Sequence, residues 1–244
     1  MVATTLEAGW EGRADQWLRW ARTPGHDAYW RYSPLFFDTI VAAPGRLTVE
    51  VGCGEGRVAR DLARRGHSVF ALDSSLSLVR HARAADPDGW YLAADATRLP
   101  LADASADLVV AYNSLMDVDD MPAAVAEAAR VLEPGGSLCI CVTHPLNDAG
   151  RFASRDPDAP FTIEGAYLGR RRFEMDVERD GLRMSFRSWS YPFEDYARAL
   201  EAAGLLIERL REPAPAPSDV AADPDYRRWQ RLPMFLFMRA VKAR

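Results

Sequence analysis

Three glycines at alternate positions follow a β-rich run in the stretch LTVEVGCGEGR. They are Gly52, Gly54 and Gly56, and Glu50 lies two residues before the first of them. Glycines so spaced allow a tight turn and let a ligand lie against the bare main chain. The pattern is not the dinucleotide fingerprint GxGxxG, because position 57 is arginine, and no GK[ST] of a P-loop follows. The Glu50 carboxylate would repel a pyrophosphate and favour a cationic ligand.

Acidic and amide side chains stand at the ends of the next apolar runs. Asp73 ends VFALD, Asp95 ends YLAAD and is followed by Ala96, and Asn113 and Ser114 follow DLVVAY. An acid at the position of Asp73 can accept hydrogen bonds from both hydroxyls of a ribose, although it could also only cap the next helix. The Asp95 carboxylate and the Ala96 backbone N–H could together read adenine; a turn aspartate is the alternative.

The elements that must position these residues alternate between strand and helix. We expect strands over 47–52, 67–73, 89–95, 104–113 and 137–144, and helices over 34–43, 57–66, 74–85 and 121–132. Apolar strands that alternate with helices form a parallel sheet covered on both faces. Ligands of such sheets bind at the carboxyl ends of the strands, where the strand order reverses. The helix over 74–85 should take Asp73 or Ser74 as its N-cap.

The chain is expected to form one domain of 244 residues. Its divisions are an N-terminal helical cap (1–45), a ligand-binding core (46–144), a lid insertion (145–191), and a C-terminal helix with two strands (192–244). Within the lid, RRFEMDVERDGLRMSFRSWS is expected to form a hairpin that turns at 179–181.

Composition and charge exclude several partner classes. The formal net charge of −5 argues against a nucleic acid or an anionic membrane as partner, since both require a basic surface. No apolar run approaches the ~20 residues of a membrane span. Three cysteines without a secretion signal indicate reduced thiols in the cytoplasm. Two of them, Cys139 and Cys141, lack further ligands nearby, so we expect core packing and no metal site.

Four segments together resemble one enzyme family. They are VEVGCGEGR, ALDSS, AADATRLPLADASADLVVAYNSLMDVDD and AARVLEPGGSLCI, and they cover about residues 47–144. They resemble the class I S-adenosylmethionine-dependent methyltransferases of the small-molecule type. The resemblance implies a Rossmann-like α/β fold: a seven-stranded, mostly parallel sheet with an antiparallel C-terminal edge, helices on both faces, and a lid insertion.

The resemblance also implies S-adenosylmethionine as the cofactor. In the family, the glycine loop contacts the methionyl portion, the acid after the second strand takes the ribose hydroxyls, the third motif holds the adenine, and N-terminal aromatic residues close over the cofactor. The residues so implied are Trp17, Trp20, Glu50, Gly52, Cys53, Gly54, Gly56, Asp73, Ser74, Asp95, Ala96, Asn113 and Ser114.

Candidates for the acceptor side are fewer. His144, at the end of the fifth strand, is the candidate general base; a structural histidine that bonds backbone before Pro145 is the alternative. His26, Tyr32 and Tyr167 could line an acceptor pocket, although each could equally serve packing. The acids at positions 117, 119 and 120 are expected to begin a helix or to face solvent.

The sequence therefore predicts methyl transfer from S-adenosylmethionine to a small molecule, with specialised metabolism as the suggested setting. One alternative is an NAD(P)-dependent oxidoreductase, which Arg57 and Glu50 disfavour. Another is a non-catalytic S-adenosylmethionine-binding protein. The sequence specifies neither the acceptor, nor O-, N- or C-methylation, nor the oligomeric state.

Overall fold

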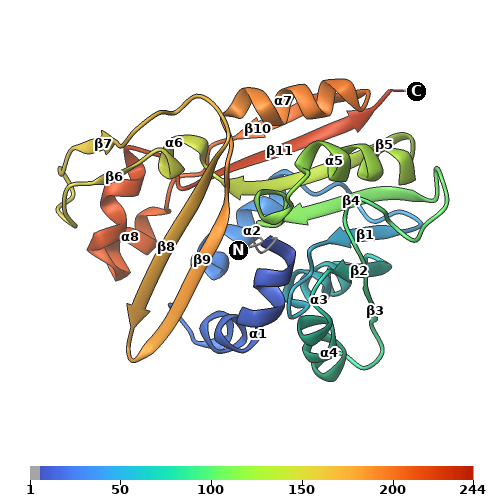
Figure 1. Ribbon diagram of the computed structural model, residues 1–244, viewed down its shortest axis with the longest axis horizontal. Coiled ribbons are helices and arrows are strands. Elements are labelled where there is room, and N and C mark those ends of the chain that lie inside the picture. The colour runs from blue at the N-terminus through green and yellow to red at the C-terminus, as the bar shows by residue number, and fades with distance from the viewer. Residues whose placement is uncertain (1–5, 244) are drawn as a thin grey trace, which may run out of the picture.

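A seven-stranded sheet forms the centre of the computed structural model, which describes residues 6–243 and their side chains except those of residues 7 and 8 (Figure 1). The strand order is β10–β11–β5–β4–β1–β2–β3. The strands are β1 (Thr48–Val51), β2 (Val69–Asp73), β3 (Trp90–Ala93), β4 (Ala106–Tyr112), β5 (Leu132–Thr143), β10 (Leu205–Arg211) and β11 (Phe235–Lys242). Strands β1 to β5 pair in parallel, and β11 pairs antiparallel with both β5 and β10. The predicted fold class is confirmed.

The central strands are mostly apolar and buried because helices cover both faces of the sheet. Leu138, Ile140 and Val142 of β5 pack into one core cluster, whereas Cys139 and Cys141 pack into the other. This division follows from the two-residue period of a strand, which sends successive side chains to opposite faces. The two cysteines are thus part of the core, as expected.

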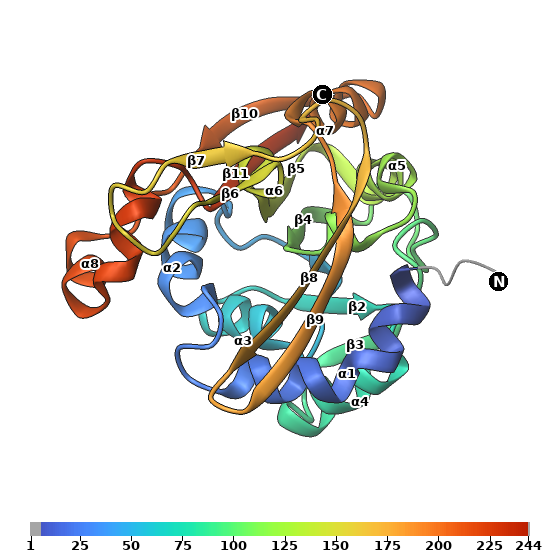
Figure 2. The same ribbon diagram turned by 60° about the vertical axis from the view of Figure 1, so that its left-hand side comes forward.

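Helices from different parts of the chain build the two layers. On one face lie α5 (Met121–Val131) and α7 (Phe193–Ala202); on the other lie α2 (Tyr29–Thr39), α3 (Arg57–Arg64) and α4 (Leu76–Ala85). The seventeen-residue helix α1 (Leu6–Arg22) lies beside α4 and strand β9 (Figure 2). Among the helices within residues 6–243, none is both long enough and apolar enough to cross a bilayer.

Several boundaries differ from the sequence expectation. The N-cap of α4 is Ser75, whose hydroxyl accepts a hydrogen bond from Leu78 N, and neither Asp73 nor Ser74. The Asp73 carboxylate is unavailable as a cap because it is bonded to two other backbone N–H groups. Strand β5 begins at Leu132, five residues before the expected start at 137, and α2 begins at Tyr29 instead of 34.

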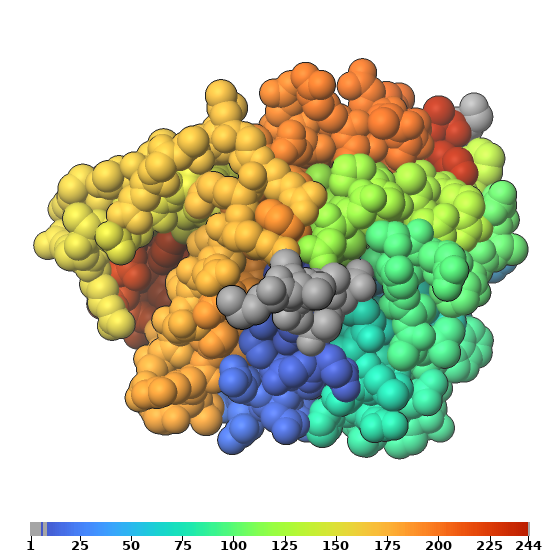
Figure 3. Space-filling model, in the orientation of Figure 1, coloured from blue at the N-terminus to red at the C-terminus, as the bar shows by residue number. Residues whose placement is uncertain are grey.

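The segment after β5 forms a short helix and two separate hairpins. These are α6 (Pro145–Asp148), β6 (Gly150–Phe152) with β7 (Phe161–Ile163), and β8 (Arg171–Arg179) with β9 (Leu182–Ser190). The predicted β8–β9 hairpin is confirmed, and Asp180 and Gly181 turn it with φ of 50° and 75°. The hairpin runs from the α7 side of the molecule to α1 (Figures 1 and 2), and its surface adjoins that of α1 in Figure 3.

Candidate active site

The glycine loop joins the end of β1 to the start of α3 at the point where the strand order reverses between β1 and β4. Gly52 has φ +75°, and its N–H donates to Leu72 O at 2.8 Å. A Cβ at Gly52 would lie 2.3 Å from Cβ of Ser114, which is held in place because its hydroxyl donates to Val51 O at 2.6 Å. The loop can therefore pass β4 only with glycine at this position.

The Asp73 carboxylate holds the glycine loop against the end of β2. One oxygen accepts from Gly54 N at 2.7 Å, and the other accepts from Ser75 N at 2.9 Å. Burial raises the pKa of Asp73 above its ordinary value, and the two backbone donors oppose that shift. Each oxygen keeps a further lone pair, so Asp73 can accept additional hydrogen bonds from a ligand.

Helix α1 is anchored beside the same strand end. Glu11 accepts from the hydroxyls of Ser75 and Ser77, at 2.5 Å and 2.6 Å, and from Ser77 N at 3.1 Å. These bonds lower the pKa of Glu11. They hold α1, which carries Trp17 and Trp20, against the start of α4.

Glu50 is a buried acid directly below the loop, with 1 % of its surface exposed. Burial raises its pKa to about 8, and the nearby Asp73 and Glu55 add to that rise. Its Oε2 atom has no hydrogen-bond partner in the described part of the chain. A positively charged ligand group would compensate this carboxylate.

We expect Glu50→Gln to change how stability depends on pH. Since the pKa of Glu50 is raised in the folded state, the unfolded chain holds fewer protons between about pH 4.5 and pH 8. Folding stability therefore falls as pH rises through this range, by at most ~1.4 kcal/mol per pH unit for this group. Glutamine does not titrate and lacks this contribution. The free energy of unfolding of the variant, relative to that of wild type, should therefore increase from pH 5 to pH 8. Urea denaturation at several pH values tests this, and a difference that is constant with pH would contradict it.

The residues of the loop line a cavity of about 780 Å³. This volume lies within the range of ~300–1,000 Å³ typical of small-molecule sites. Most of the residues implied by the family resemblance line it: Trp17, Trp20, Glu50, Gly52, Cys53, Gly54, Asp73, Ser74, Ala96, Asn113 and Ser114. His26, a candidate for the acceptor side, lines it as well. The structure thus brings together residues from five separate segments.

Three other cofactor and acceptor candidates face elsewhere. Tyr32 is 2 % exposed and packs edge-on against Phe235 in the core, with 5.0 Å between the ring centroids. The Tyr167 hydroxyl accepts from Phe193 N at 3.1 Å at the start of α7. Asp95 is exposed and accepts from the backbone N–H and the hydroxyl of Thr97. None of the three is among the residues that line the cavity.

Gly56 also lies behind the cavity wall. It is the N-cap residue of α3, and a Cβ on it would lie 2.9 Å from the Tyr91 ring and 3.0 Å from Ala82. Position 56 thus requires glycine because of helix packing and a positive φ. A contact with the ligand is not needed to explain the glycine.

The candidate base His144 has a structural role instead. Its Nδ1 accepts from Leu146 N at 3.1 Å and caps α6, and its Nε2 lies 3.0 Å from Glu212 Oε1. Burial lowers the pKa of His144, and Glu212 opposes that shift. Both ring nitrogens are thus occupied, and the imidazole is not among the cavity-lining groups. The structure thus shows the structural alternative for His144, and its role as general base stays a prediction.

His144→Ala is accordingly expected to affect folding and not the ligand. Loss of the cap and of the Glu212 contact should lower the free energy of unfolding by about 1 kcal/mol. The affinity for S-adenosylmethionine, measured by calorimetry, should stay at the wild-type value. A large loss of affinity with unchanged stability would restore His144 to the site.

Two acids that line the cavity were not identified from the sequence. Asp117, expected to begin a helix or to face solvent, lies in the 3₁₀ turn η1 (Leu115–Asp117) at the cavity wall. Burial raises its pKa well above the ordinary range, and the nearby Arg13 opposes that rise. Asp148, at the end of α6, is 8 % exposed, and burial raises its pKa to about 8. Asp148 lies five residues beyond the end of β5, so no strand-end pattern in the sequence marked it.

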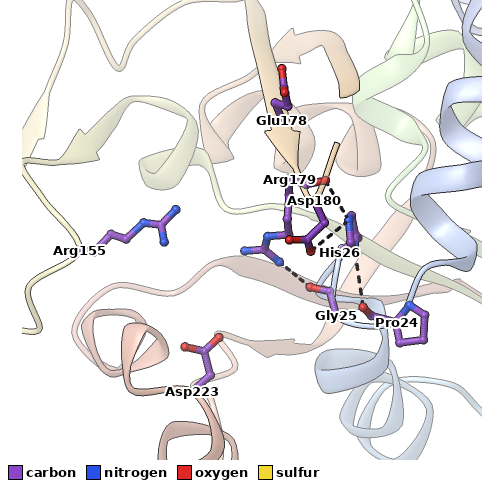
Figure 4. Close-up of a pocket in the computed structure, with 8 residues that line it drawn as sticks. All are labelled: Pro24, Gly25, His26, Arg155, Glu178, Arg179, Asp180 and Asp223. Atoms are coloured by element: carbon purple, nitrogen blue, oxygen red, sulfur yellow. Dashed lines mark hydrogen bonds and ion pairs between the residues drawn. The ribbon is translucent and has the colours of Figure 1, made fainter. Parts of the chain in front are cut away.

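The tip of the β8–β9 hairpin lies against the loop between α1 and α2, at a second pocket (Figure 4). His26 Nε2 lies 3.2 Å from Arg179 O and 3.8 Å from the Asp180 carboxylate, and Arg179 donates to Gly25 O. A second cavity, of about 490 Å³, lies here and shares His26, Arg155 and Arg179 with the main one.

Comparison with known proteins places this site in a family. Residues 49–140 match the model of the methyltransferase domain. The chain is 37 % identical over 116 residues to a demethylmenaquinone methyltransferase of Renibacterium salmoninarum. The aligned residues are 47 % of this chain and 49 % of that protein. It is 31 % identical over 172 residues to a malonyl-[acyl-carrier protein] O-methyltransferase of Enterobacter lignolyticus, covering 67 % and 66 %. The chain spans about half the length of the first of these curated relatives.

A solved structure extends the similarity over nearly the whole chain. An S-adenosylmethionine-dependent methyltransferase of Mesorhizobium loti is 26 % identical, with 88 % of this chain and 98 % of that chain covered and a TM-score of 0.72. The chain belongs to the class I S-adenosylmethionine-dependent methyltransferases. S-adenosylmethionine is the cofactor of this family, which confirms the cofactor predicted from the sequence.

The site of this methyltransferase fits that cofactor. S-adenosylmethionine carries a sulfonium and an amine but no phosphate, and the cavity wall holds the buried Glu50 and the half-buried Asp73 and Asp117. The unpartnered Oε2 of Glu50 and the glycine cradle at Gly52 both suit a compact cationic group that approaches the main chain.

Proposed function

We propose that this protein transfers the methyl group of S-adenosylmethionine to a small-molecule acceptor. The observation that carries the proposal is the Asp73 carboxylate, which fastens the glycine loop at the strand-order reversal and lines a cavity large enough for cofactor and acceptor together. Ligands of open α/β sheets bind at this position.

The chain's own residues would divide the work of binding. The loop from Gly52 to Gly54 offers bare backbone to the methionyl portion, Asp73 and Ser74 accept from the ribose, and Ala96 lies at the adenine end. Asn113 and Ser114 face the loop from the end of β4. Trp17 of α1 lies on the outer side, where its Nε1 would be 3.4 Å from a Cβ at Gly54, and covers the loop.

The acceptor would bind on the side formed by the lid. Phe173, Val177 and Phe186 of the β8–β9 hairpin line this part of the cavity together with Trp229 of η2 (Pro224–Gln230). These apolar walls suit a ring-bearing acceptor. They lie outside residues 49–140, which match the family model, so we propose that the acceptor is specific to this protein, as in specialised metabolism.

Catalysis would depend mainly on position. When bound, S-adenosylmethionine supplies an electrophilic methyl carbon with a sulfonium leaving group. The protein's part is to hold the acceptor in line with that carbon and to exclude water, and such positioning can lower the barrier by ~7–11 kcal/mol. Helix α1 and the hairpin form the walls that exclude water from the cavity.

Radiolabelled methyl transfer tests this function. The purified protein would be incubated with methyl-labelled S-adenosylmethionine and separate fractions of small molecules, RNA and protein from bacterial extracts, with Asp73→Ala as the control. We expect label in the small-molecule fraction alone, with formation of S-adenosylhomocysteine, and none with the variant. Label in RNA or protein, or cofactor binding without transfer to any fraction, would contradict the proposal.

A further inference from the structure

Asp148 is a buried acid to which cofactor binding assigns no role. It ends α6, just beyond the carboxyl end of β5, and it lines the cavity with Asn147. It is 8 % exposed. No hydrogen bond or ion pair joins its carboxylate oxygens to any residue within 6–243. These oxygens are not among the fully buried side-chain atoms that lack a partner, so a ligand in the cavity can reach them.

The groups that face Asp148 do not supply a partner. Arg171 of β8 donates to the backbone oxygen of Asp148, and its charge lowers the pKa of the carboxyl only partly. Asp117 of η1 and Tyr196 of α7 also lie near enough to interact with it electrostatically, and neither is a cation. Burial therefore dominates, and it raises the pKa of Asp148 to about 8.

Aromatic side chains of the hairpin line the same cavity as this acid. Arg171 and Phe173 are two residues apart on β8 and so point to the same face of the hairpin. Phe173 pairs with Ser188, and both line the cavity, as does Phe186 farther along β9. These aromatic side chains suit a flat ring in the same cavity as Asp148.

We propose that Asp148 is the general base for an acceptor whose nucleophile is a phenolic hydroxyl. This inference rests on the proposed function. As the phenol oxygen forms its bond to the methyl carbon, the O–H proton passes to an Asp148 carboxylate oxygen, while the bond from methyl carbon to sulfur breaks and its electron pair stays on sulfur.

The chemistry of the proton favours this acceptor class over others. A phenol loses its proton near pH ~10, as tyrosine does, whereas an ordinary aspartate has a pKa of ~3.9 and is a weak base toward it. With a pKa of about 8, Asp148 is far better matched to a phenol. A carboxylate acceptor is already ionised and needs no base.

Two substitutions separate proton transfer from binding. Asp148→Asn keeps an oxygen that can accept from the hydroxyl but cannot take the proton, and Asp148→Leu removes the acceptor altogether. The matched control is Glu212→Gln, which disturbs His144 without touching the cavity. The probes are 2-naphthol and 2-methoxynaphthalene, which differ only by the methyl group that the reaction would add.

The first readout is binding to the complex with S-adenosylhomocysteine. Wild type, Asp148→Asn and Glu212→Gln should bind 2-naphthol at least tenfold more tightly than its methyl ether, and Asp148→Leu should lose that preference. Carbon-13 NMR of labelled aspartate should show one carboxyl that titrates near pH 8 in wild type and is absent from Asp148→Asn. Equal binding of both probes by wild type, or no such titration, would overturn the proposal.

The second readout is methylation of 2-naphthol against pH. The wild-type rate should rise as the carboxyl ionises and level off above about pH 8. Asp148→Asn should be slower by roughly 100-fold or more and lose that rise, the effect expected of a missing general base. A wild-type rate and profile in Asp148→Asn would refute the role of base. If S-adenosylhomocysteine itself does not bind, the proposed function fails; if it binds and these results do not appear, this inference alone fails.

Discussion

Gly52→Ala is expected to weaken S-adenosylmethionine binding by about 100-fold, or about 2.7 kcal/mol, and to destabilise the fold. The new Cβ would lie 2.3 Å from that of Ser114, whose hydroxyl is bonded to Val51 O. Relief of this contact requires the loop to move away from β4. The left-handed conformation at φ +75° adds ~1–2 kcal/mol of strain, and the overpacking adds ~1–3 kcal/mol. Calorimetry and urea denaturation would measure the two effects.

Gly204→Ala is the matched control for that variant. Gly204 has a similar φ of +72°, and a Cβ there would meet nothing within 4 Å. It should therefore show the conformational strain alone, about 1 kcal/mol of lost stability, with unchanged affinity for the cofactor. Equal affinities in the two glycine variants would contradict the role assigned to the loop.

The second large effect is expected from Asp73→Asn. An asparagine has one side-chain oxygen, so it cannot accept from both Gly54 N and Ser75 N as the two carboxylate oxygens do. One backbone donor would lose its partner, at a cost of about 1–3 kcal/mol, and the loop would be released from β2. The ribose would lose a charged acceptor at the same time. We expect about 100-fold weaker cofactor binding together with a lower free energy of unfolding.

Asp95→Asn tests whether the effect belongs to Asp73 in particular. Asp95 ends the next apolar run, but its exposed carboxylate serves Thr97. Surface substitutions usually change free energies by no more than ~0.5 kcal/mol, so the dissociation constant should change by about twofold or less. A larger loss of affinity in Asp95→Asn than in Asp73→Asn would return Asp95 to the adenine site.

The fold and the cofactor side were accessible from sequence because local patterns determine them. Mostly apolar runs such as LVVAY and LCICV indicate a sheet covered on both faces, and glycine and acid positions mark the ends of its strands. The turn at Asp180–Gly181 likewise follows from local chemistry. Exact caps were less predictable: Asp73 was expected to cap α4, but its carboxylate serves the distant Gly54.

The acceptor side was less accessible because contacts between distant segments determine it. His144 bonds to Glu212, which is 68 residues away in sequence, so its surroundings do not follow from its neighbours in the chain. The Tyr167 hydroxyl accepts a hydrogen bond from Phe193 N in the first turn of α7. Asp117 and Asp148 look like turn residues in the sequence, and only the hairpin and α1, folded over them, turn them into buried acids. No local pattern carries that information.

Isothermal titration of the purified protein with S-adenosylmethionine, S-adenosylhomocysteine and NADH tests the central claim most directly. The site described here has buried acids beside the glycine loop and arginine at position 57, so it should bind the first two ligands with micromolar dissociation constants and reject NADH. Preference for NADH, or no binding of either S-adenosyl compound, would contradict the account.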